Sequence, residues 1–352
     1  MSQIRIKENI IWYEERRPHY EKFEHKINKL ITEILDSEKI PYHTIESRTK
    51  SLDSFNSKIK QKMISKPTEI EDIVGVRIIG YVESDILKII SVIKENFDLD
   101  YNKMENKQKE LGVSKVGYRS THFLCNLSNN RSRLSEYQQF SDIPFELQIR
   151  TILQHAWAEI EHDRNYKFSG ILPEEIQRNF NLLSGLLELA DNEFERISNL
   201  IEKYSQQVSQ NTKEGKLDIT INSTSLKQFL IERFGDNNHI KPTFESVSSD
   251  DSRIIVDELH DMGIHTLLDL ENIIPKDLEE IYEKLNSKTT FARLIRQILI
   301  IHDMEKYFTD AWKSHFLSFT SDSEYTLGEY GINLKKIQDY FRHAISNPNM
   351  GE

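Results

Sequence analysis

The residue types best suited to chemistry are concentrated between Ile143 and Lys167. In the first half of this stretch, IPFELQIR, apolar residues alternate with Glu146, Gln148 and Arg150. This two-residue period predicts a half-buried strand whose polar face puts an acid beside a base. An edge strand with solvated polar side chains would show the same alternation, so the pattern alone leaves both interpretations open.

The second half of the stretch, TILQHAWAEIEHDRNYK, changes to a helical period. Its apolar residues are spaced for one helical face, and His155, Glu159 and His162 follow one another at i, i+4 and i+7 on a neighbouring face. A polar strand face therefore runs directly into a polar helix face. The spacing differs from the H-E-x-x-H of zinc proteases, so a zinc triad is not favoured.

A basic segment, HTIESRTKSLDSFNSKIKQKMISK, follows Pro41. On a helix, Lys50, Ser54 and Lys58 would share one face. Like charges so placed repel by a few tenths of a kcal/mol per pair unless an anion relieves them. A polyphosphate would do so, and a solvated basic face is the alternative. From Arg48 to Lys66 one acid, Asp53, is set among six bases: Arg48, Lys50, Lys58, Lys60, Lys62 and Lys66.

Residues 70 to 97 predict a Val- and Ile-rich strand followed by a helix. Asp72 stands at the start of the strand, and Arg77 interrupts its apolar run. A buried arginine needs a partner or a ligand, so Arg77 either forms an ion pair across the sheet or binds a ligand. After a polar loop, GYRSTHFLCNL predicts another strand, with Tyr118 and His122 on one face. Tyr118 could be a stacking platform or simply a strand former.

Length and composition limit the classes of protein to which this chain can belong. With 352 residues and 38% hydrophobic content, the chain can bury a sizeable core and is long enough for two domains. The formal net charge of -11 argues against a general nucleic-acid-coating protein. One cysteine, Cys125, fits a reducing compartment, and the charged N-terminus has no run of signal-peptide or membrane-spanning length. We expect a soluble cytoplasmic protein.

Helical patterns flank the predicted strands. Residues 8 to 37 predict one or two helices, with Pro18 as a potential break, and residues 171 to 205 predict a long helix. Residues 206 to 216 are polar and aperiodic, which is typical of a linker. Beyond them, residues 217 to 352 predict a mainly helical domain, including a helix from Phe291 to Phe316. That domain either stabilises the first domain, joins subunits or senses a regulator.

Four segments in order, SRTKSLDSFNSK, EDIVGVRI, GYRSTH and ELQIRTILQHAWAEIEHDRNYK, resemble the synthetase domain of the RelA/SpoT family. The resemblance covers about residues 10 to 205, and the synthetase domain that it implies spans residues 1 to 205. It implies an α/β (α+β) fold with a mixed five-stranded sheet flanked by helices, as in nucleotidyltransferases. It also implies a GTP pyrophosphokinase, which moves the pyrophosphate of ATP to the ribose 3′-hydroxyl of GDP or GTP with Mg²⁺ and so makes an alarmone.

The resemblance also assigns roles to individual residues. Asp72 would be the main Mg²⁺ ligand, and Glu146 would share the ion or take the hydroxyl proton; one or two carboxylates are usual for Mg²⁺. The implied ATP-binding residues are Arg48 and Arg77, which would sandwich adenine, and Lys50, Ser54 and Lys58 on the phosphates. The implied acceptor-binding residues are Tyr118, stacked on guanine, with His122, Gln148, Arg150, His155 and Lys167.

Departures from the family pattern keep alternatives open. Many relatives have Pro-Lys and Asn before the Gly-Tyr, where this chain has Val113 to Val116, so the acceptor is not fixed. Some compact relatives are toxins that modify the 3′ end of tRNA. A silent nucleotide-binding module is a third option, against which the presence of both Asp72 and Glu146 argues. The metal-dependent hydrolase domain of long relatives is not expected, and compact members are often homo-oligomers.

Overall fold

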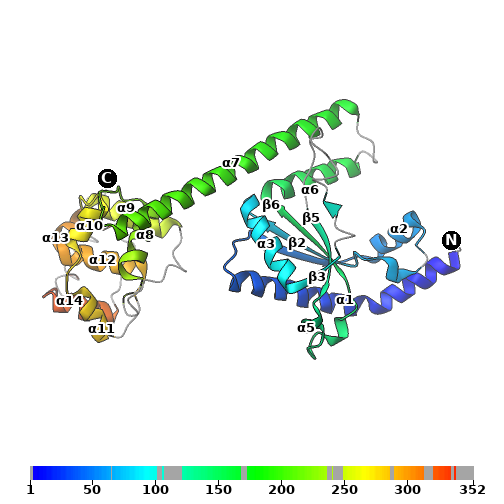
Figure 1. The fold of residues 1–352 in the computed structure, drawn as a ribbon, viewed down its shortest axis with the longest axis horizontal. Helices are drawn as coiled ribbons and strands as arrows, with labels where there is room; N and C mark the ends of the chain where they lie inside the picture. Colours follow the sequence, from blue (N-terminus) through cyan, green and yellow to red (C-terminus); the bar gives the residue numbers. More distant parts are fainter. Residues whose placement is uncertain are drawn as a thin grey trace. The chain divides into compact units, whose positions relative to one another are not determined.

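The computed structural model describes residues 3–64, 66–100, 105–106, 121–167, 173–235, 240, 249–285, 289–312, 320–333 and 337. It divides into two compact units, Met1–Asn199 and Leu200–Glu352, which we call unit 1 and unit 2 (Figure 1). Among the described helices, none combines the length and the apolar character that a membrane crossing requires.

A mixed sheet forms the centre of unit 1. Its strands run in the order β1-β2-β6-β5-β3, with a two-residue strand, β4, paired to β5. β2 and β6 are parallel, and the other pairs are antiparallel. The predicted mixed five-stranded sheet is therefore confirmed, with β4 as an addition. The strands are β1 (Thr44–Thr49), β2 (Val74–Gly80), β3 (Phe97–Leu99), β4 (Glu105–Asn106), β5 (Thr121–Leu127) and β6 (Phe145–Thr151).

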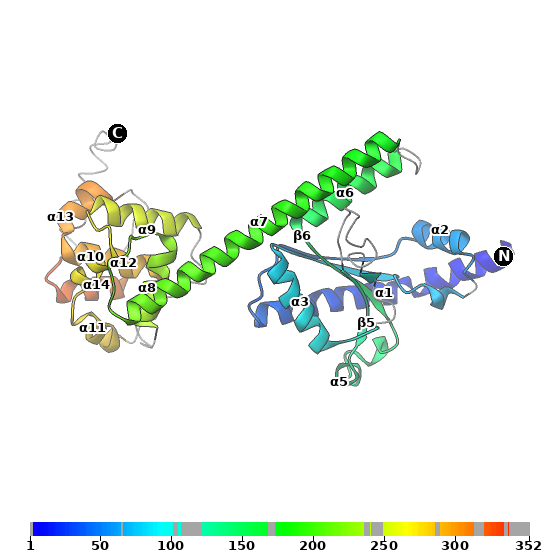
Figure 2. The ribbon, with the colours of Figure 1, turned by 45° about the horizontal axis from the view of Figure 1, so that its top comes forward.

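The two faces of this sheet differ in chemistry because polar and apolar residues alternate along its central strands. On one face, Val76, Leu147 and Phe123 represent a row of buried side chains. Helices α1 (Gln3–Ser37) and α3 (Glu83–Asn96) cover that face, and α6 (Ile152–Lys167) lies on the other side (Figures 1 and 2). The second face keeps the polar residues of the same strands, so the site forms there.

Helix α1 runs through Pro18 without a break. A proline inside a helix costs about 3 kcal/mol. Tyr13 before it and Phe23 after it are both fully buried against the same core, and this burial holds the two halves in line. The tyrosine also positions the basic segment, because its hydroxyl donates a hydrogen bond to the Lys50 carbonyl at 2.5 Å and its ring stacks on Phe55 of α2 (Leu52–Lys62).

Helix α7 (Glu174–Lys213) is longer than expected. In unit 1, buried Asp191 accepts a hydrogen bond from Thr151 at the end of β6, and Glu195 accepts one from the Ser84 amide at the start of α3, both at 2.9 Å. The predicted linker at 206–216 is instead helical up to Lys213. Within unit 2, Val208 is buried and Lys213 pairs with Glu232 at 3.3 Å, so packing overrides the polar composition.

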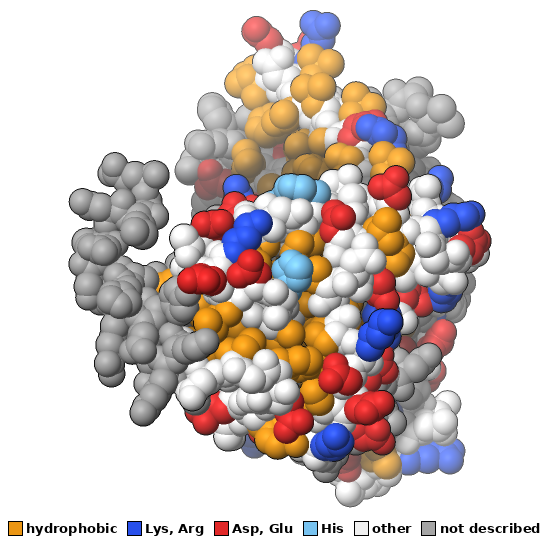
Figure 3. All heavy atoms as spheres, turned by 90° about the vertical axis from the view of Figure 1, so that its left-hand side faces the viewer, with side chains coloured by type: hydrophobic (Ala, Val, Ile, Leu, Met, Phe, Trp, Pro, Cys, Tyr) orange, Lys and Arg blue, Asp and Glu red, His pale blue; other side chains and the backbone are white. Residues whose placement is uncertain are grey.

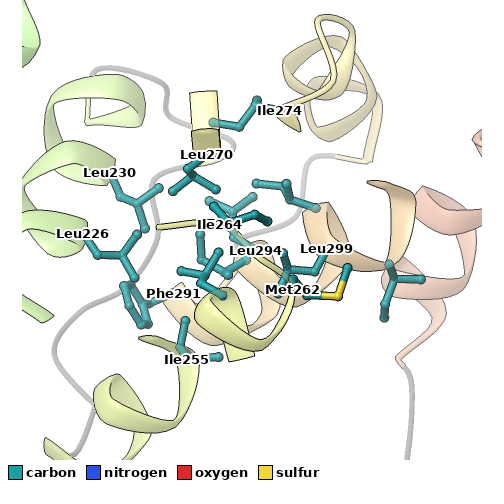
Figure 4. Packing of buried hydrophobic residues seen from close by; sticks show 14 of the residues in the cluster. Leu226, Leu230, Ile255, Met262, Ile264, Leu270, Ile274, Phe291, Leu294 and Leu299 are labelled. Carbon is teal, nitrogen blue, oxygen red and sulfur yellow. The ribbon is translucent and has the colours of Figure 1, made fainter. Parts of the chain in front are cut away.

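Unit 2 is mainly helical, as predicted. Its core is formed by apolar residues of several short helices, including Leu226, Ile255, Leu270 and Leu294 (Figure 4). The helix expected from Phe291 to Phe316 ends at His302. The helices are α8 (Ser223–Phe234), α9 (Ser249–Asp261), α10 (Leu267–Ile273), α11 (Leu278–Leu285), α12 (Phe291–His302), α13 (Met304–Lys306) and α14 (Ser321–Glu329), with a π-helical turn at Tyr307–Ala311. Figure 3 shows a face of this unit on which acidic and basic side chains are interspersed around hydrophobic ones.

A buried ion pair links two helices of this core. Glu258 of α9 has no exposed surface, and Arg296 of α12 binds it through two nitrogens at 2.9 and 2.7 Å. The Tyr307 hydroxyl donates to the same carboxylate at 3.1 Å. Glu258 therefore has hydrogen-bond donors on both of its oxygens.

We expect Glu258→Ala to lower the free energy of unfolding of unit 2 by about 3–5 kcal/mol, because it leaves Arg296 without its buried partner. Urea denaturation followed by circular dichroism measures this loss. The double variant Glu258→Leu/Arg296→Leu should lose less than the single variant, since it removes both charges. A single variant as stable as the wild type would contradict this account of the core.

Candidate active site

The register of four strands brings the predicted site residues onto one face of the sheet. Glu46 of β1 pairs with Arg77 of β2, Arg77 with Gln148 of β6, and Gln148 with His122 of β5. Residues directly opposite each other project to the same side. One row of side chains therefore crosses the sheet from β1 to β5.

A second row lies beside the first, with a glycine at its centre. Arg48 pairs with Gly75, and Gly75 pairs with Glu146. Because Gly75 has no side chain, a cavity of about 250 Å³ opens between the two rows. We call it the sheet cavity. Its lining residues are Glu46, Ser47, Arg48, Gly75, Val76, Arg77, Glu146 and Gln148.

Glu146 also lines a second cavity, of about 240 Å³, which we call the Asp72 cavity. Basic and acidic groups meet in it. The side chains lining it are those of Lys58, Lys62, Ile64, Glu69, Glu71, Asp72, His122, Phe123, Leu124 and Glu146. Since the two cavities share Glu146, one carboxylate faces both.

Two lysines converge on Asp72. The Nζ atoms of Lys50 and Lys58 lie 2.8 and 2.7 Å from its Oδ2. Burial raises the pKa of Asp72, but the hydrogen bonds and charges of the two lysines outweigh burial and hold that pKa below its ordinary value. The spacing in the sequence suggested that Lys50 and Lys58 lie on one helix. In the structure Lys50 precedes α2, which begins at Leu52. The two ammonium groups nevertheless meet at one carboxylate.

Glu146 is paired with His122. The Nδ1 atom of the imidazole lies 3.1 Å from Oε1 of the carboxylate. This hydrogen bond lowers the pKa of Glu146, and it prevails over burial and the nearby Asp72 charge, both of which raise that pKa. Glu146 is therefore an anion at neutral pH. In this arrangement it is a good cation ligand and hydrogen-bond acceptor but a weak base.

Arg77 forms the ion pair across the sheet that was one of its two expected roles. Its Nη1 lies 3.2 Å from Glu46 and 3.0 Å from Glu159 of α6. Arg150, whose side chain is buried, binds the same oxygen of Glu159 at 3.2 Å. Glu159 thus links the two arginines, and His155 lies 3.8 Å from it. Burial and the Arg150 and Arg77 charges lower the pKa of His155.

The donor set around Asp72 fits a magnesium ion. Its Oδ1 atom is buried and accepts no hydrogen bond from any described residue, although Oδ2 accepts two. A buried carboxylate oxygen without a partner is costly unless a cation or water binds it. Glu146 supplies a second carboxylate to the same cavity. Mg²⁺ prefers such oxygen ligands and usually takes only one or two from the protein.

Most of the predicted site residues are therefore brought together. Arg48, Arg77 and Gln148 line the sheet cavity, and Lys58, Asp72 and His122 line the Asp72 cavity, with Glu146 in both and Lys50 joined to Asp72. Ser54 lines neither cavity; its amide donates to Ser51, the N-cap of α2. Tyr118 and the side chain of Lys167 lie outside the described residues.

The sequence did not assign three acids to the site, and it named Lys62 in the basic segment without assigning it a role. Glu46 pairs with Arg77, and Lys62, Glu69 and Glu71 line the Asp72 cavity. The alternation of TIESRT would have found Glu46, since it lies two residues before Arg48 on the same strand. Glu69 ends a short 3₁₀ turn (Pro67–Glu69) and Glu71 follows it, and no periodic pattern in the sequence marks either residue.

These features define unit 1 as an α/β domain with one apolar sheet face and one charged, cavity-bearing face. Residues 47–171 match the model of the region found in RelA and SpoT proteins. This part of the chain is similar to the region that RelA and SpoT proteins share.

Individual proteins and solved structures are similar to parts of the chain. The chain is 33% identical to the GTP pyrophosphokinase YwaC of Bacillus subtilis (strain 168) over 141 residues. These aligned residues make up 39% of this chain and 64% of that protein. It is 26% identical over 167 residues to the GTP pyrophosphokinase YjbM of the same strain, covering 46% of this chain and 75% of that protein. The crystal structure of small alarmone synthetase 1 from Bacillus subtilis aligns with a TM-score of 0.45 and 22% identity, over 55% of this chain and 98% of that one.

The lowered pKa of Asp72 predicts a pH-dependent contribution to stability. Because the folded-state pKa lies below the ordinary value of 3.8, the ion pairs stabilise the fold above that pH and are lost as the pH falls through the folded-state pKa. We expect Asp72→Asn to lower the free energy of unfolding by about 1 kcal/mol at pH 7.

Urea denaturation at a series of pH values measures this difference, which should shrink toward zero below pH 3.8. Asp53→Asn, at an exposed position in the first turn of α2, is the matched control and should change little. A difference between wild type and Asp72→Asn that stays constant with pH would show that the effect is not caused by ionisation.

Proposed function

We propose that unit 1 is a GTP pyrophosphokinase that transfers the β,γ-pyrophosphate of ATP to the 3′-hydroxyl of GDP or GTP. The observation that carries this proposal is the convergence of Lys50, Lys58 and Asp72 beside Glu146, on the face that also holds Arg48 and Arg77. Phosphoryl-type transfer needs little covalent chemistry from the protein, but it needs charge neutralisation and positioning. This face offers both.

The relatives add support. Two proteins whose names are GTP pyrophosphokinase match 141 and 167 residues of the chain. The match spans slightly less than two thirds of the first and three quarters of the second. Each segment that forms the two cavities lies inside or next to the matched family region at 47–171.

The two cavities suggest where ATP binds. Its adenine would enter the sheet cavity between Arg48 and Arg77, since guanidinium groups stack on flat rings. The ion pairs of Arg77 with Glu46 and Glu159 engage the edge of its guanidinium and so fix the plane of the group. The triphosphate would extend toward the Asp72 cavity, where Lys50 and Lys58 bind phosphate oxygens in place of Asp72.

Asp72 and Glu146 would hold Mg²⁺. When bound, the ion neutralises charge on the donor phosphates. Release of Asp72 from its two lysines frees its carboxylate for the ion and the lysines for phosphate. Glu146, with its lowered pKa, would mainly orient the acceptor hydroxyl and accept its hydrogen bond. His122 would hold Glu146 in the rotamer that faces both cavities.

The acceptor would lie across β6 and α6. Tyr118 would stack on guanine, and Gln148, Arg150, His155 and Lys167 would bind the ribose and phosphates. Arg150 is paired with Glu159, so an acceptor phosphate would have to compete with that carboxylate. Unit 2 has a hydrophobic core of its own, which includes none of the site residues. We therefore assign it a role in regulating or assembling the enzyme rather than in the transfer itself.

An assay with ATP labelled at the γ-phosphate and Mg²⁺ tests the proposal, with GDP, GTP and bulk tRNA offered separately. We expect label in a guanine nucleotide. Label in tRNA alone would replace the proposal by a tRNA-modifying activity. Label in none of the three, with ATP binding intact by calorimetry, would support a silent nucleotide-binding module instead.

Asp72→Asn should reduce transfer by about 10²-fold or more, because it removes the main cation ligand and weakens charge stabilisation during transfer. Initial rates at saturating ATP measure the loss, and circular dichroism checks the fold. Asp53→Asn is again the control and should keep full activity. If both variants transferred label at the wild-type rate, the metal role of Asp72 would be wrong.

Tyr118→Ala should raise the KM for the acceptor by about 5- to 150-fold, which corresponds to the 1–3 kcal/mol typical of base stacking on an aromatic ring. The KM for ATP should stay the same. Tyr118→Phe keeps the ring and serves as the matched control. A change confined to the KM for ATP would place Tyr118 on the donor side.

A further inference from the structure

One carboxylate of α6 joins an arginine of the proposed donor site to an arginine of the proposed acceptor site. The Oε1 atom of Glu159 lies 3.0 Å from Nη1 of Arg77 and 3.2 Å from Nη2 of Arg150. A single oxygen atom therefore accepts hydrogen bonds from two guanidinium groups. Because each arginine is assigned to a different nucleotide, a change at one of them can reach the other through Glu159.

The fold brings these three residues together from three elements. Arg77 of β2 lies opposite Gln148 of β6, and Arg150 follows Gln148 by two residues, on the same face of the sheet. β6 then passes directly into α6, which begins at Ile152. Glu159 lies about two turns into this helix, from where its side chain reaches both strands.

The members of this cluster differ in how strongly they are buried. The side chain of Arg150 is 4% exposed and that of Glu159 is 55% exposed, so the carboxylate can change partner without repacking of the core. Arg77 has a second carboxylate partner, Glu46 of β1, at 3.2 Å. Burial and the two arginine charges lower the pKa of His155, so its imidazole adds no third positive charge at neutral pH.

We propose that Glu159 is a positioning residue that couples the binding of the donor to the binding of the acceptor. This inference rests on the proposed function, because it takes ATP as the ligand of Arg77 and a guanine nucleotide as the ligand of Arg150. In the structure the carboxylate is shared between the two arginines. An acceptor phosphate displaces Glu159 from Arg150, and the carboxylate then pairs with Arg77 alone.

The change of partner favours the second ligand for a physical reason. A carboxylate that is no longer shared can bind the guanidinium of Arg77 through two hydrogen bonds, which fix the plane of that group for stacking on adenine. Linked binding is reciprocal, so ATP must strengthen acceptor binding by the same factor. Glu46 lies on β1, on the side of Arg77 away from β6 and Arg150, so it holds Arg77 without linking the two sites.

Calorimetric binding of two ligands to the full chain tests the coupling. The probes are GDP and, with Mg²⁺, an ATP analogue in which a methylene group replaces the oxygen between the α- and β-phosphorus, so that no transfer occurs during the titration. In the wild type, saturating analogue should lower the Kd for GDP by about 5-fold or more, as is usual for coupled sites. Saturating GDP should lower the Kd for the analogue by the same factor.

Glu159→Gln should abolish this coupling and shift the two separate affinities in opposite directions, each by about 2- to 5-fold. GDP should bind more tightly, because Arg150 loses a competing carboxylate, and the analogue more weakly, because Arg77 loses one of its two carboxylates. A damaged fold would weaken both ligands instead. Glu46→Gln is the matched control: it also removes a carboxylate from Arg77 and should weaken the analogue, but it should keep the coupling.

Three results would overturn the proposal: a wild type that does not bind GDP or binds the two ligands independently, a Glu159→Gln chain with the coupling of the wild type, or a Glu46→Gln chain that loses the coupling as completely. Transfer of label from ATP is a separate measurement. Coupled binding without transfer would refute the proposed function alone, and transfer to GDP with uncoupled binding would refute the role of Glu159 alone.

Discussion

The parallel pairing of β2 with β6 determines where the polar side chains of unit 1 lie. It sets Gly75 beside Glu146 and Arg77 beside Gln148. A shift of one residue would turn Glu146 into the apolar core and expose Leu147. Burial of Val76, Ile78 and Leu147 on the opposite face opposes any such shift. The packing of the hydrophobic core under α1 and α3 thus maintains the geometry of the charged face above it.

The charged face is stabilised by internal pairing. Asp72 binds two lysines, Glu146 binds His122, and Glu159 binds two arginines. Half-buried charges of one sign would be costly without such partners. In the proposed function, each pair would also keep its members near the nucleotide and the cation. Binding a polyphosphate would then exchange carboxylate partners for phosphate oxygens, with little change in side-chain position.

The sequence predicted the sheet, and it predicted that most of the candidate site residues share one face of it, because the two-residue period in β6 and the apolar run of β2 are local signals. The position of Lys50 was harder to predict. Lys50 lies in the segment between β1 and α2. The path of this segment depends on the hydrogen bond from the Tyr13 hydroxyl, thirty-seven residues earlier, to the Lys50 carbonyl. Glu69 and Glu71 reach the Asp72 cavity through an irregular turn, and irregular turns leave no period. The helical continuation at 206–213 depends on contacts with Glu232, which composition does not reveal.

Helix α7 shows how one element can serve two requirements. One side of it is tied to the site, since Asp191 accepts a hydrogen bond from Thr151, the residue directly after Arg150, while eight large apolar side chains of the helix are exposed. A helix needed only to close unit 1 would gain nothing from eight exposed apolar residues, and exposed patches of this kind carry a risk of aggregation. The hydrogen bond between Thr151 and Asp191 is buried, so the packing of α7 against unit 1 restrains the end of β6 and, with it, the backbone next to Arg150.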